Sequence, residues 1–168
     1  NLDGNSIGSS AMSALSEGLK INKFINAISL KSNQIGDEGI IALTDGIKNN
    51  TTLISIGLGN NQISDNGIIA FSDALSINKT LVSISLEDNE IRDNGAISLF
   101  DSIKDHHELE YLSLTGNRIG VDGIKALSDA LKINSSFAFI LLYNNDYGET
   151  GRDILYEIKN FSSITLYY

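Results

Sequence analysis

Apolar and polar residues alternate along this chain in a pattern that returns every 28 residues. The stretch Ile28-x-Leu30 shows the alternation of a strand with one buried face. The same positions recur one period later as Ile56 and Leu58, and an asparagine follows three residues after the second one. This asparagine is found at Asn5, Asn33, Asn61, Asn89, Asn117 and Asn145. A fixed period of this length predicts a solenoid, in which each repeat packs only on its neighbours.

Each period predicts one strand followed by one helix. We expect strands at residues 27–31, 55–59, 83–87, 111–115 and 139–143. After the asparagine a glycine recurs, and pairs such as Ala42-Leu43 and Gly46-Ile47 follow it with the i, i+1, i+4, i+5 spacing of one helix face. Helices are therefore expected to begin near residues 39, 67, 95, 123 and 151. The predicted fold class is an α/β solenoid of about six strand–helix units, forming one domain over residues 1–168.

Asparagine occurs at two positions of the repeat, and we expect a different role for each. At the strand end, a short polar side chain can hydrogen-bond backbone groups of its own and neighbouring turns, so the six asparagines are predicted to form a structural ladder. At the helix end, a second set consists of Asn22, Asn50, Asn78 and Asn134. There we expect a positive φ, which asparagine tolerates, and His106 takes this position in the fourth full period.

Charge and cysteine content exclude several classes of function. The net charge is −9 with a sequence pI near 4.5, so the chain lacks the basic face that nucleic acid or an anionic membrane would require. The absence of cysteine favours a reducing compartment, and we expect a cytoplasmic protein. The chain starts inside a repeat without Met, which indicates a segment of a longer protein.

No motif for catalysis or for a cofactor is present. The chain has no cysteine nucleophile, no Gly-rich phosphate loop and no Ser/His/Asp set supported by a motif. The pair His106-His107 has no third ligand at a metal-like spacing, and a structural role is favoured for it. We therefore expect no enzymatic activity, no cofactor and no bound metal.

The repeat resembles a known family. Residues 53–78 contain the frame Leu-x-x-Ile-x-Leu-x-x-Asn-x-Ile and then Ala-Phe-x-x-Ala-Leu-x-x-Asn, which is similar to leucine-rich repeats of the ribonuclease-inhibitor-like class. NOD-like receptors and the GTPase-activating protein of Ran carry repeats of this type. The resemblance implies a right-handed curved solenoid with a parallel sheet on its concave face and helices on its convex face. The last period departs from the frame, with Tyr147 at the isoleucine position, so residues 161–168 are expected to form a cap or a junction.

Concave positions can be assigned because residues 28 apart become lateral neighbours in a parallel sheet. They are small in the N-terminal half and become aromatic or apolar toward the C-terminus, at Tyr111, Phe139, Leu141 and Tyr143. Two interpretations remain open for these four residues: a binding surface, favoured for Tyr111, and burial under the C-terminal segment, favoured for Phe139 and Leu141. The adjacent Glu87 and Asp88 have no evident basic neighbour on the next turn and are candidates for contact with a partner.

The favoured function is a protein–protein interaction module, a scaffold or sensor arm that binds its partner on the concave face. Because aromatic and acidic residues adjoin, we expect a partner segment that is amphipathic or basic. Two alternatives remain open from the sequence: a regulator of a small GTPase of the activating type, and a microbial effector that acts on a host protein. The oligomeric state is not indicated by any pattern.

Overall fold

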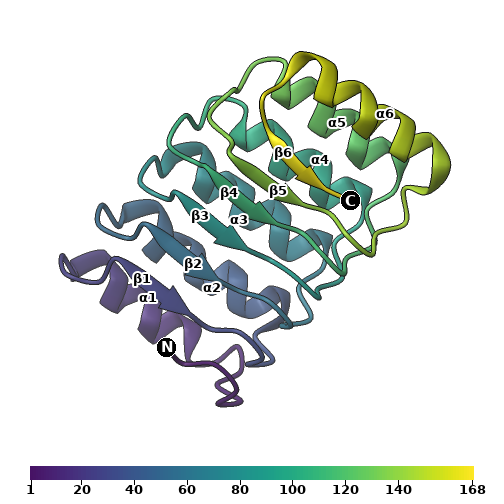
Figure 1. Cartoon of the computed structure of the whole chain (residues 1–168). Helices are drawn as coiled ribbons and strands as arrows, with labels where there is room; N and C mark the ends of the chain where they lie inside the picture. Colours follow the sequence, from purple (N-terminus) through teal and green to yellow (C-terminus); the bar gives the residue numbers. More distant parts are fainter.

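The computed structural model describes residues 1–168 and consists of helices and strands that alternate along the chain (Figure 1). The helices are α1 (Met12–Ile21), α2 (Gly36–Asn49), α3 (Asp65–Ile77), α4 (Asp93–Ile103), α5 (Val121–Leu131) and α6 (Gly148–Phe161). The strands are β1 (Ala27–Ser29), β2 (Ser55–Gly57), β3 (Ser83–Ser85), β4 (Tyr111–Ser113), β5 (Phe139–Leu141) and β6 (Thr165–Tyr167).

All six strands belong to one parallel sheet in chain order, β1-β2-β3-β4-β5-β6. From β1 to β5 each residue pairs with the one 28 positions later, as in Ile28↔Ile56 and Ile84↔Leu112. Constant register follows from the constant period, since no repeat contains an insertion that would shift one strand against the next. The predicted α/β solenoid with a single parallel sheet is confirmed.

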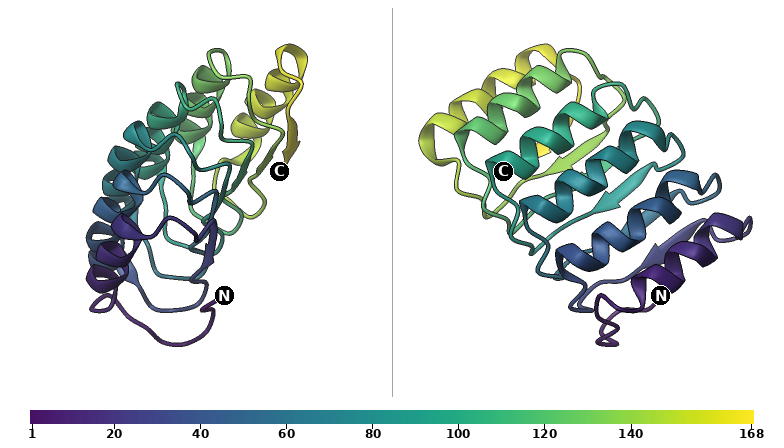
Figure 2. Two further views of the ribbon diagram at one scale, coloured as in Figure 1. Left: turned by 90° about the vertical axis from the view of Figure 1, so that its left-hand side faces the viewer. Right: turned by 180° about the vertical axis from the view of Figure 1, so that it is seen from behind.

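The helices form a second layer that covers one face of the sheet, and the other face is left free (Figure 2). Between the layers lies one continuous hydrophobic core. In the first full repeat, Ile28 and Leu30 from the strand side meet Ile40, Leu43 and Ile47 from α2, all of them buried. The helix layer is wider than the sheet layer, so the stack curves, as the side view shows (Figure 2).

The first residues of the helices differ from the predicted ones by two or three positions. Helices begin at residues 36, 65, 93, 121 and 148, before the recurring glycine, and each strand is three residues long. The glycine therefore lies inside the first turn of the helix, where it permits close approach of the preceding repeat. A Cβ at Gly95, for example, would lie only 2.6 Å from Asp65 Oδ1.

Aspartates at the starts of α2, α3 and α4 cap the helix of the following repeat, which is α3, α4 and α5 respectively. Asp65 Oδ1 accepts a hydrogen bond from the amide of Arg92, at 2.7 Å. Asp93 Oδ1 accepts from the amides of Gly120 and Gly123, at 2.8 and 2.9 Å, in the first turn of α5. A carboxylate at this end satisfies free N–H groups and interacts favourably with the helix dipole. One repeat thus supplies the N-terminal cap of the next, a role that was not assigned from the sequence.

The strand-end asparagines form a hydrogen-bonded ladder. Asn61 is fully buried, and its Oδ1 accepts from the amides of Asn33 and Ile35 in the preceding repeat, at 2.9 and 3.4 Å. Its Nδ2 donates to Leu30 O of that repeat and to Leu58 O of its own, at 2.9 and 3.0 Å. Each asparagine therefore joins two successive turns of the solenoid.

The expected conformation of the helix-end asparagines is wrong. Asn22, Asn50 and Asn78 have φ of −73°, −78° and −67°, in the extended region. They form a second ladder instead, in which Asn50 Nδ2 donates to Leu19 O at 2.7 Å and to Asn22 O at 3.2 Å. The left-handed conformation occurs at the other edge, for example at Ser32 and Gln34. Asparagine is selected here for its two hydrogen-bonding functions and not for its tolerance of positive φ.

The C-terminal residues extend the sheet. β6 pairs in parallel with β5, with Phe139 opposite Thr165 and Leu141 opposite Tyr167. This spacing is 26 residues, so the last repeat is two residues shorter than the others. The segment therefore lies beside β5 and does not fold over its concave side chains, which corrects the preference for burial of Phe139 under a cap. None of the helices combines the length and apolar character needed to cross a membrane.

Candidate functional site

The concave face of the sheet changes character along the solenoid. In the N-terminal half its positions are occupied by small residues such as Ser55, Gly57, Ser83 and Ser85. In the C-terminal half large side chains occupy the same columns, and we call these residues the C-terminal aromatic surface: Tyr111, Phe139, Leu141, Tyr143 and Tyr167. From β1 to β5 the strand geometry and the 28-residue register are constant, so only the side chains distinguish the two halves there.

Much of the C-terminal aromatic surface is open to solvent. Phe139, Tyr143 and Tyr167 expose 43%, 44% and 40% of their surface, while Tyr111 and Leu141 are half-buried. Phe139 lies between Tyr111 and Thr165 in the sheet register, and the rings of Tyr143 and Tyr167 have centroids 6.2 Å apart. Aromatic side chains that are exposed together, on a face with no packing role, are typical of protein-binding surfaces.

A hollow of about 530 Å³ adjoins this surface where β5 leads into α6. Tyr143 and Tyr168 line it together with Asp146 and Arg152. Tyr147 forms part of its wall, and burial raises the pKa of this phenol. The hollow therefore offers aromatic side chains and charges of both signs next to the exposed rings. Tyr167 and Arg152 were not among the residues predicted from the sequence. The shortened last repeat hides the register of Tyr167, and Arg152 lies on α6, outside the concave columns.

Glu87 is less available than the sequence indicated. Its carboxylate reaches across Gly59 to Lys31, two strands away, with Oε1 3.3 Å from Lys31 Nζ, and it also accepts a hydrogen bond from Ser85. Burial alone would raise the pKa of Glu87, but the bonds from Ser85 and Lys31 outweigh it and lower the pKa. The expectation of an unpaired Glu87 is wrong, because it considered only the adjacent turn and not the neighbour beyond a glycine.

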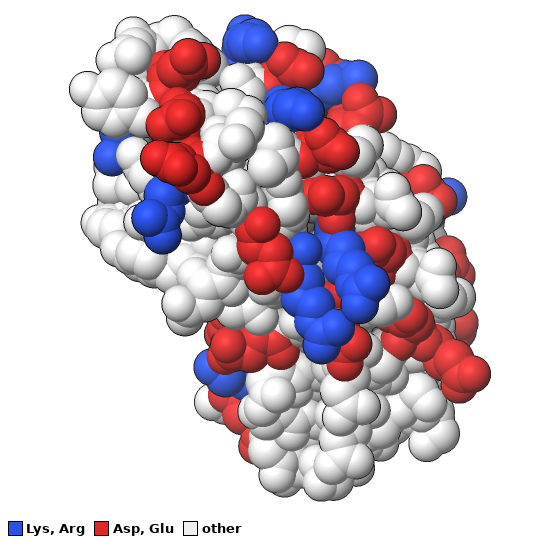
Figure 3. All heavy atoms as spheres, turned by 90° about the vertical axis from the view of Figure 1, so that its right-hand side faces the viewer, with Lys and Arg blue, Asp and Glu red and all other residues white.

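Asp88 remains exposed beside the C-terminal aromatic surface. Its φ is +54°, and its Oδ1 lies so close to Gly116 that a Cβ there would approach within 2.3 Å. Further along this edge, Glu90 pairs with Arg118 at 3.8 Å, and both side chains are about half exposed. On the side of the molecule in Figure 3, a central group of Lys and Arg side chains is bordered by Asp and Glu.

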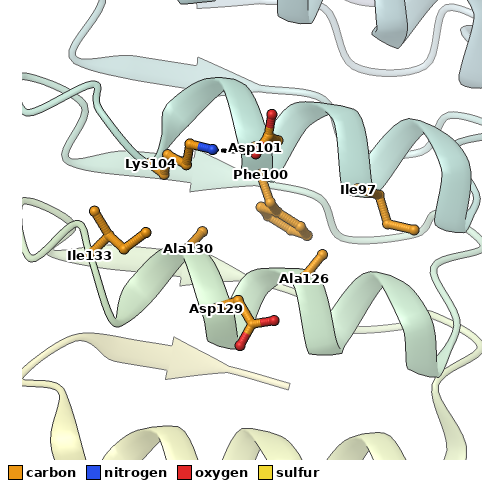
Figure 4. A pocket seen from close by; sticks show the side chains of 8 residues that line it. All are labelled: Ile97, Phe100, Asp101, Lys104, Ala126, Asp129, Ala130 and Ile133. Atoms are coloured by element: carbon orange, nitrogen blue, oxygen red, sulfur yellow. Dashed lines mark hydrogen bonds and ion pairs between the residues drawn. The ribbon is translucent and has the colours of Figure 1, made fainter.

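A second recess lies on the convex side, between α4 and α5 (Figure 4). It measures about 270 Å³, and the ring of Phe100 points from α4 toward Ala126 on α5. Two carboxylates line it: Asp101 pairs with Lys104 at 2.6 Å, and Asp129 pairs with Lys132 at 2.7 Å. This recess is smaller than the hollow near Tyr143, and the charge at its rim is compensated within the chain.

No arrangement of side chains for metal binding is present: no group of three or more His, Cys, Asp or Glu residues could hold an ion. His106 is fully buried, and neither ring nitrogen has a hydrogen-bond partner. The adjacent His107 is exposed. The two histidines therefore do not converge on a common site.

Two solved structures similar to this chain have the same fold. One is "Leiomodin-1 Actin-Binding Site 2 (ABS2)", with a TM-score of 0.73 and 20% identity over 86% of this chain and 85% of that chain. The other is the tropomodulin C-terminal domain of Caenorhabditis elegans, with a TM-score of 0.69 and 14% identity over 89% of this chain and 91% of that chain. No curated protein matches the chain. At these identities the similarity shows the fold alone.

The family itself is shown by four matches to the "Leucine Rich repeat" model, at residues 22–43, 49–72, 78–100 and 106–128. They cover more than half of the chain, and their boundaries follow the repeat derived from the hydrophobic pattern. The narrower ribonuclease-inhibitor-like class is not separated from other classes by this match and stays a prediction. The chain belongs to the leucine-rich repeat family.

Proposed function

We propose that this domain binds a protein partner through the C-terminal aromatic surface and performs no chemistry itself. The observation that carries the proposal is the exposure of Phe139, Tyr143 and Tyr167 on adjacent strands of a face with no packing role. Aromatic anchors of this kind bury a large area at a low cost in side-chain entropy.

The partner segment is expected to present apolar side chains flanked by basic ones. The domain carries a net charge of −9, and Asp88 and Asp146 are exposed at the edge of the C-terminal aromatic surface. Complementary charge at such an edge accelerates encounter and selects the partner, whereas buried aromatic contacts supply the affinity. An amphipathic helix or an extended segment along the concave face meets both requirements.

The test compares two tyrosines. Tyr143→Ala removes an anchor from the C-terminal aromatic surface, and Tyr156→Ala removes a tyrosine on α6 that is 67% exposed. Loss of an anchor is expected to cost about 2 kcal/mol, roughly 30-fold in Kd, while the α6 variant leaves binding unchanged. The Kd of a partner captured from cytosol would be measured by calorimetry. Equal effects of the two variants would contradict the proposal.

A second pair of variants replaces residues of the C-terminal aromatic surface by the residues that occupy the same column in the N-terminal half. Tyr111→Ser and Phe139→Ser introduce the side chain found at Ser55 and Ser83 in the same column, with the same strand geometry. Each should weaken binding while the circular dichroism spectrum stays unchanged. If serine is tolerated at both positions, the aromatic rings are not the anchors.

Variants of charged residues separate the effect on the association rate from the effect on affinity. Asp88→Asn keeps a side chain that accepts the positive φ, and it should lower the association rate and its salt dependence. Glu87→Lys would also break the contact with Lys31, so it reports on the fold as well as on the partner. Asp73→Asn, on the outer face of α3, is the control and should change neither rate nor affinity.

Actin is the first protein to test, because one structurally similar domain is named as an actin-binding site. Co-sedimentation with actin filaments and binding to monomeric actin would both be measured, with Tyr143→Ala as the control. Acceleration of GTP hydrolysis by a small GTPase would favour the regulatory alternative instead. The absence of cysteine is consistent with a partner in a reducing compartment such as the cytoplasm, which localisation in cells would test.

A further inference from the structure

The helix-end ladder is interrupted in one repeat. In three of the repeats the segment after the helix reads Asn-x-Thr or Asn-x-Ser, at residues 50–52, 78–80 and 134–136. In the repeat between the last two, residues 106–108 read His-His-Glu. The asparagine and the hydroxyl residue that bond to the preceding repeat are therefore both replaced in one segment, between α4 and β4.

Three hydrogen bonds that the other repeats make are absent there. Asn134 Nδ2 donates to Ile103 O and His106 O, at 2.7 and 3.0 Å, and Ser136 Oγ donates to Leu109 O at 2.9 Å. One repeat earlier, the equivalent acceptors are the carbonyls of Leu75, Asn78 and Leu81. No side chain of residues 106–108 donates to any of them. Substitution of His106 and Glu108 thus weakens the attachment of this segment to the repeat before it.

A lysine partly replaces the missing donor. Lys79 Nζ lies 3.5 Å from Leu75 O, the carbonyl that an asparagine at position 106 would reach. This bond is long, and it places a positive charge near the imidazole of His106. The histidine ring is fully buried, and neither Nδ1 nor Nε2 has a partner. A protonated imidazole carries a charge and two N–H donors. Burial without hydrogen-bond acceptors for these donors strongly favours the neutral ring.

The other groups around His106 provide little compensation. Charges that act on it come from Lys79 in the preceding repeat and from His107 in its own segment, and both disfavour protonation. The following repeat contributes Asn134 and Ser136, which are uncharged and donate to the carbonyl of His106. The nearby backbone groups of His106 and Asn78 favour the protonated ring and raise its pKa. Burial, followed by the charge of Lys79, outweighs them and lowers the pKa of His106 to about 4.

We propose that the segment around His106 is an acid-sensitive opening point of the solenoid, at which residues 104–110 detach from the preceding repeat while the strand-end ladder stays intact. Opening gives His106 access to water and releases it from the charge of Lys79. The segment leads directly into Tyr111, so its opening also loosens one side of the C-terminal aromatic surface. This last consequence rests on the proposed function, whereas the opening itself does not.

The direction of the pH effect follows from proton linkage. His106 has a pKa of about 4 in the closed state and 6.5, the ordinary value, when exposed. Well above pH 6.5 the ring is neutral in both states, and opening is then independent of its titration. As the pH falls from 6.5 toward 4, the open state binds the proton and gains population. At pH 5 the open population should be about 20-fold larger than at pH 7.

Hydrogen exchange of single amides tests the proposal in the unmodified protein. The amides of Glu110 and Tyr111, at the C-terminal end of the segment that opens, both donate to Val82 O in the preceding repeat. The equivalent amides one repeat later, of Ala138 and Phe139, donate to Glu110 O and follow an intact Asn134. After correction for intrinsic exchange, protection at Glu110 and Tyr111 should fall about 20-fold from pH 7 to pH 5, with little change at Ala138 and Phe139.

Two variants assign the effect to the histidine. His106→Asn should restore donors to Leu75 O and Asn78 O and abolish the selective loss of protection. His107→Asn changes the exposed neighbour and should leave that loss as in the wild type. Equal loss at both pairs of amides would overturn the proposal, as would loss that persists in H106N or an imidazole of His106 that titrates near 6.5 in NMR. If H106N does not fold, the comparison within the wild-type protein decides.

Discussion

The two edges of this solenoid use the same residue type with different outcomes. At the edge where strands lead into helices, the asparagine position is kept from Asn5 to Asn145 without interruption. At the edge where helices lead into strands, it is interrupted at His106. Asparagine serves both edges because its Oδ1 accepts from N–H groups and its Nδ2 donates to carbonyls. Histidine at one of these positions fills the space but makes neither bond to the neighbouring repeat.

The comparison shows that one substitution can weaken a repeat protein locally. Apart from the ion pair Glu87–Lys31, which spans two repeats, each repeat packs on the one before and the one after, so a lost contact is not compensated from elsewhere. The chain retains its register at His106 because the sheet and the strand-end ladder hold the same two repeats together. The strand-end edge is therefore the stronger attachment, and the helix-end edge is where differences between repeats accumulate.

The largest effect is expected at the strand-end edge. Asn89 is buried and bonds the amides of Asn61 and Ile63 and the carbonyls of Leu58 and Leu86. Asn89→Ala leaves several of these buried groups unpaired and should lower the free energy of unfolding by about 3 kcal/mol.

The matched control for that variant is Asn5→Ala. Asn5 is exposed at the end of the ladder and donates only to carbonyls of its own turn, so its loss should have a much smaller effect. Urea unfolding of both variants measures the difference. Equal midpoints would mean that the strand-end asparagines do not act as a ladder.

At the helix-end edge, two adjacent asparagines give a direct comparison. Asn50 is 1% exposed and bonds Leu19 O, while Asn49 is exposed and bonds only within α2, to Asp45. Asn50→Ala should cost about 2 kcal/mol, because buried backbone groups lose their partners. Asn49→Ala should be close to neutral in the same unfolding experiment. A larger effect of Asn49→Ala would show that the helix end itself, and not the stacking of repeats, is stabilised.

The aspartate caps should contribute less. Asp93→Ala removes the acceptor for the amides of Gly120 and Gly123 at the start of α5, and a cost of about 1 kcal/mol is expected. Asp122→Ala, two residues into α5, removes an exposed partner of Lys125 and serves as the control. The amide of Gly123 should lose protection from exchange in the first variant only. Loss in both would indicate a general effect of charge near the helix start.

The smallest effect is expected on the convex surface. Lys20 pairs with Glu17 and Asp45. The hydrogen bonds that Lys20 donates to these carboxylates, the one to Asp45 first, raise the pKa of Lys20. A raised pKa means that any stabilisation is present at neutral pH and lost only as the pH rises through the lysine's titration. Because the groups face solvent, Lys20→Gln should leave the melting temperature unchanged at pH 7. A clear decrease would show that convex ion pairs also hold repeats together.

The candidate site could be predicted only in part. Tyr111, Phe139, Leu141 and Tyr143 were assigned to the concave face because side chains alternate along a strand and the period places them in columns. The degree to which these side chains are buried was not predictable, because it depends on the position of residues 161–168 relative to the sheet. The contact between Glu87 and Lys31 was also missed, because it spans two repeats across Gly59, a path that no local pattern indicates.

The sequence by itself determined the solenoid, the parallel register of the first five strands and the face of each core residue. It did so because a constant period repeats the same local preferences, and each repeat can bury its apolar side only against the next. Tertiary structure alone decided the chain path beyond Phe161, where β6 joins the sheet after 26 residues, and the partner of each charged group. It also decided the state of His106, whose ring becomes unpaired only when the neighbouring repeats enclose it. These outcomes depend on contacts between residues far apart in the chain, which periodicity does not encode.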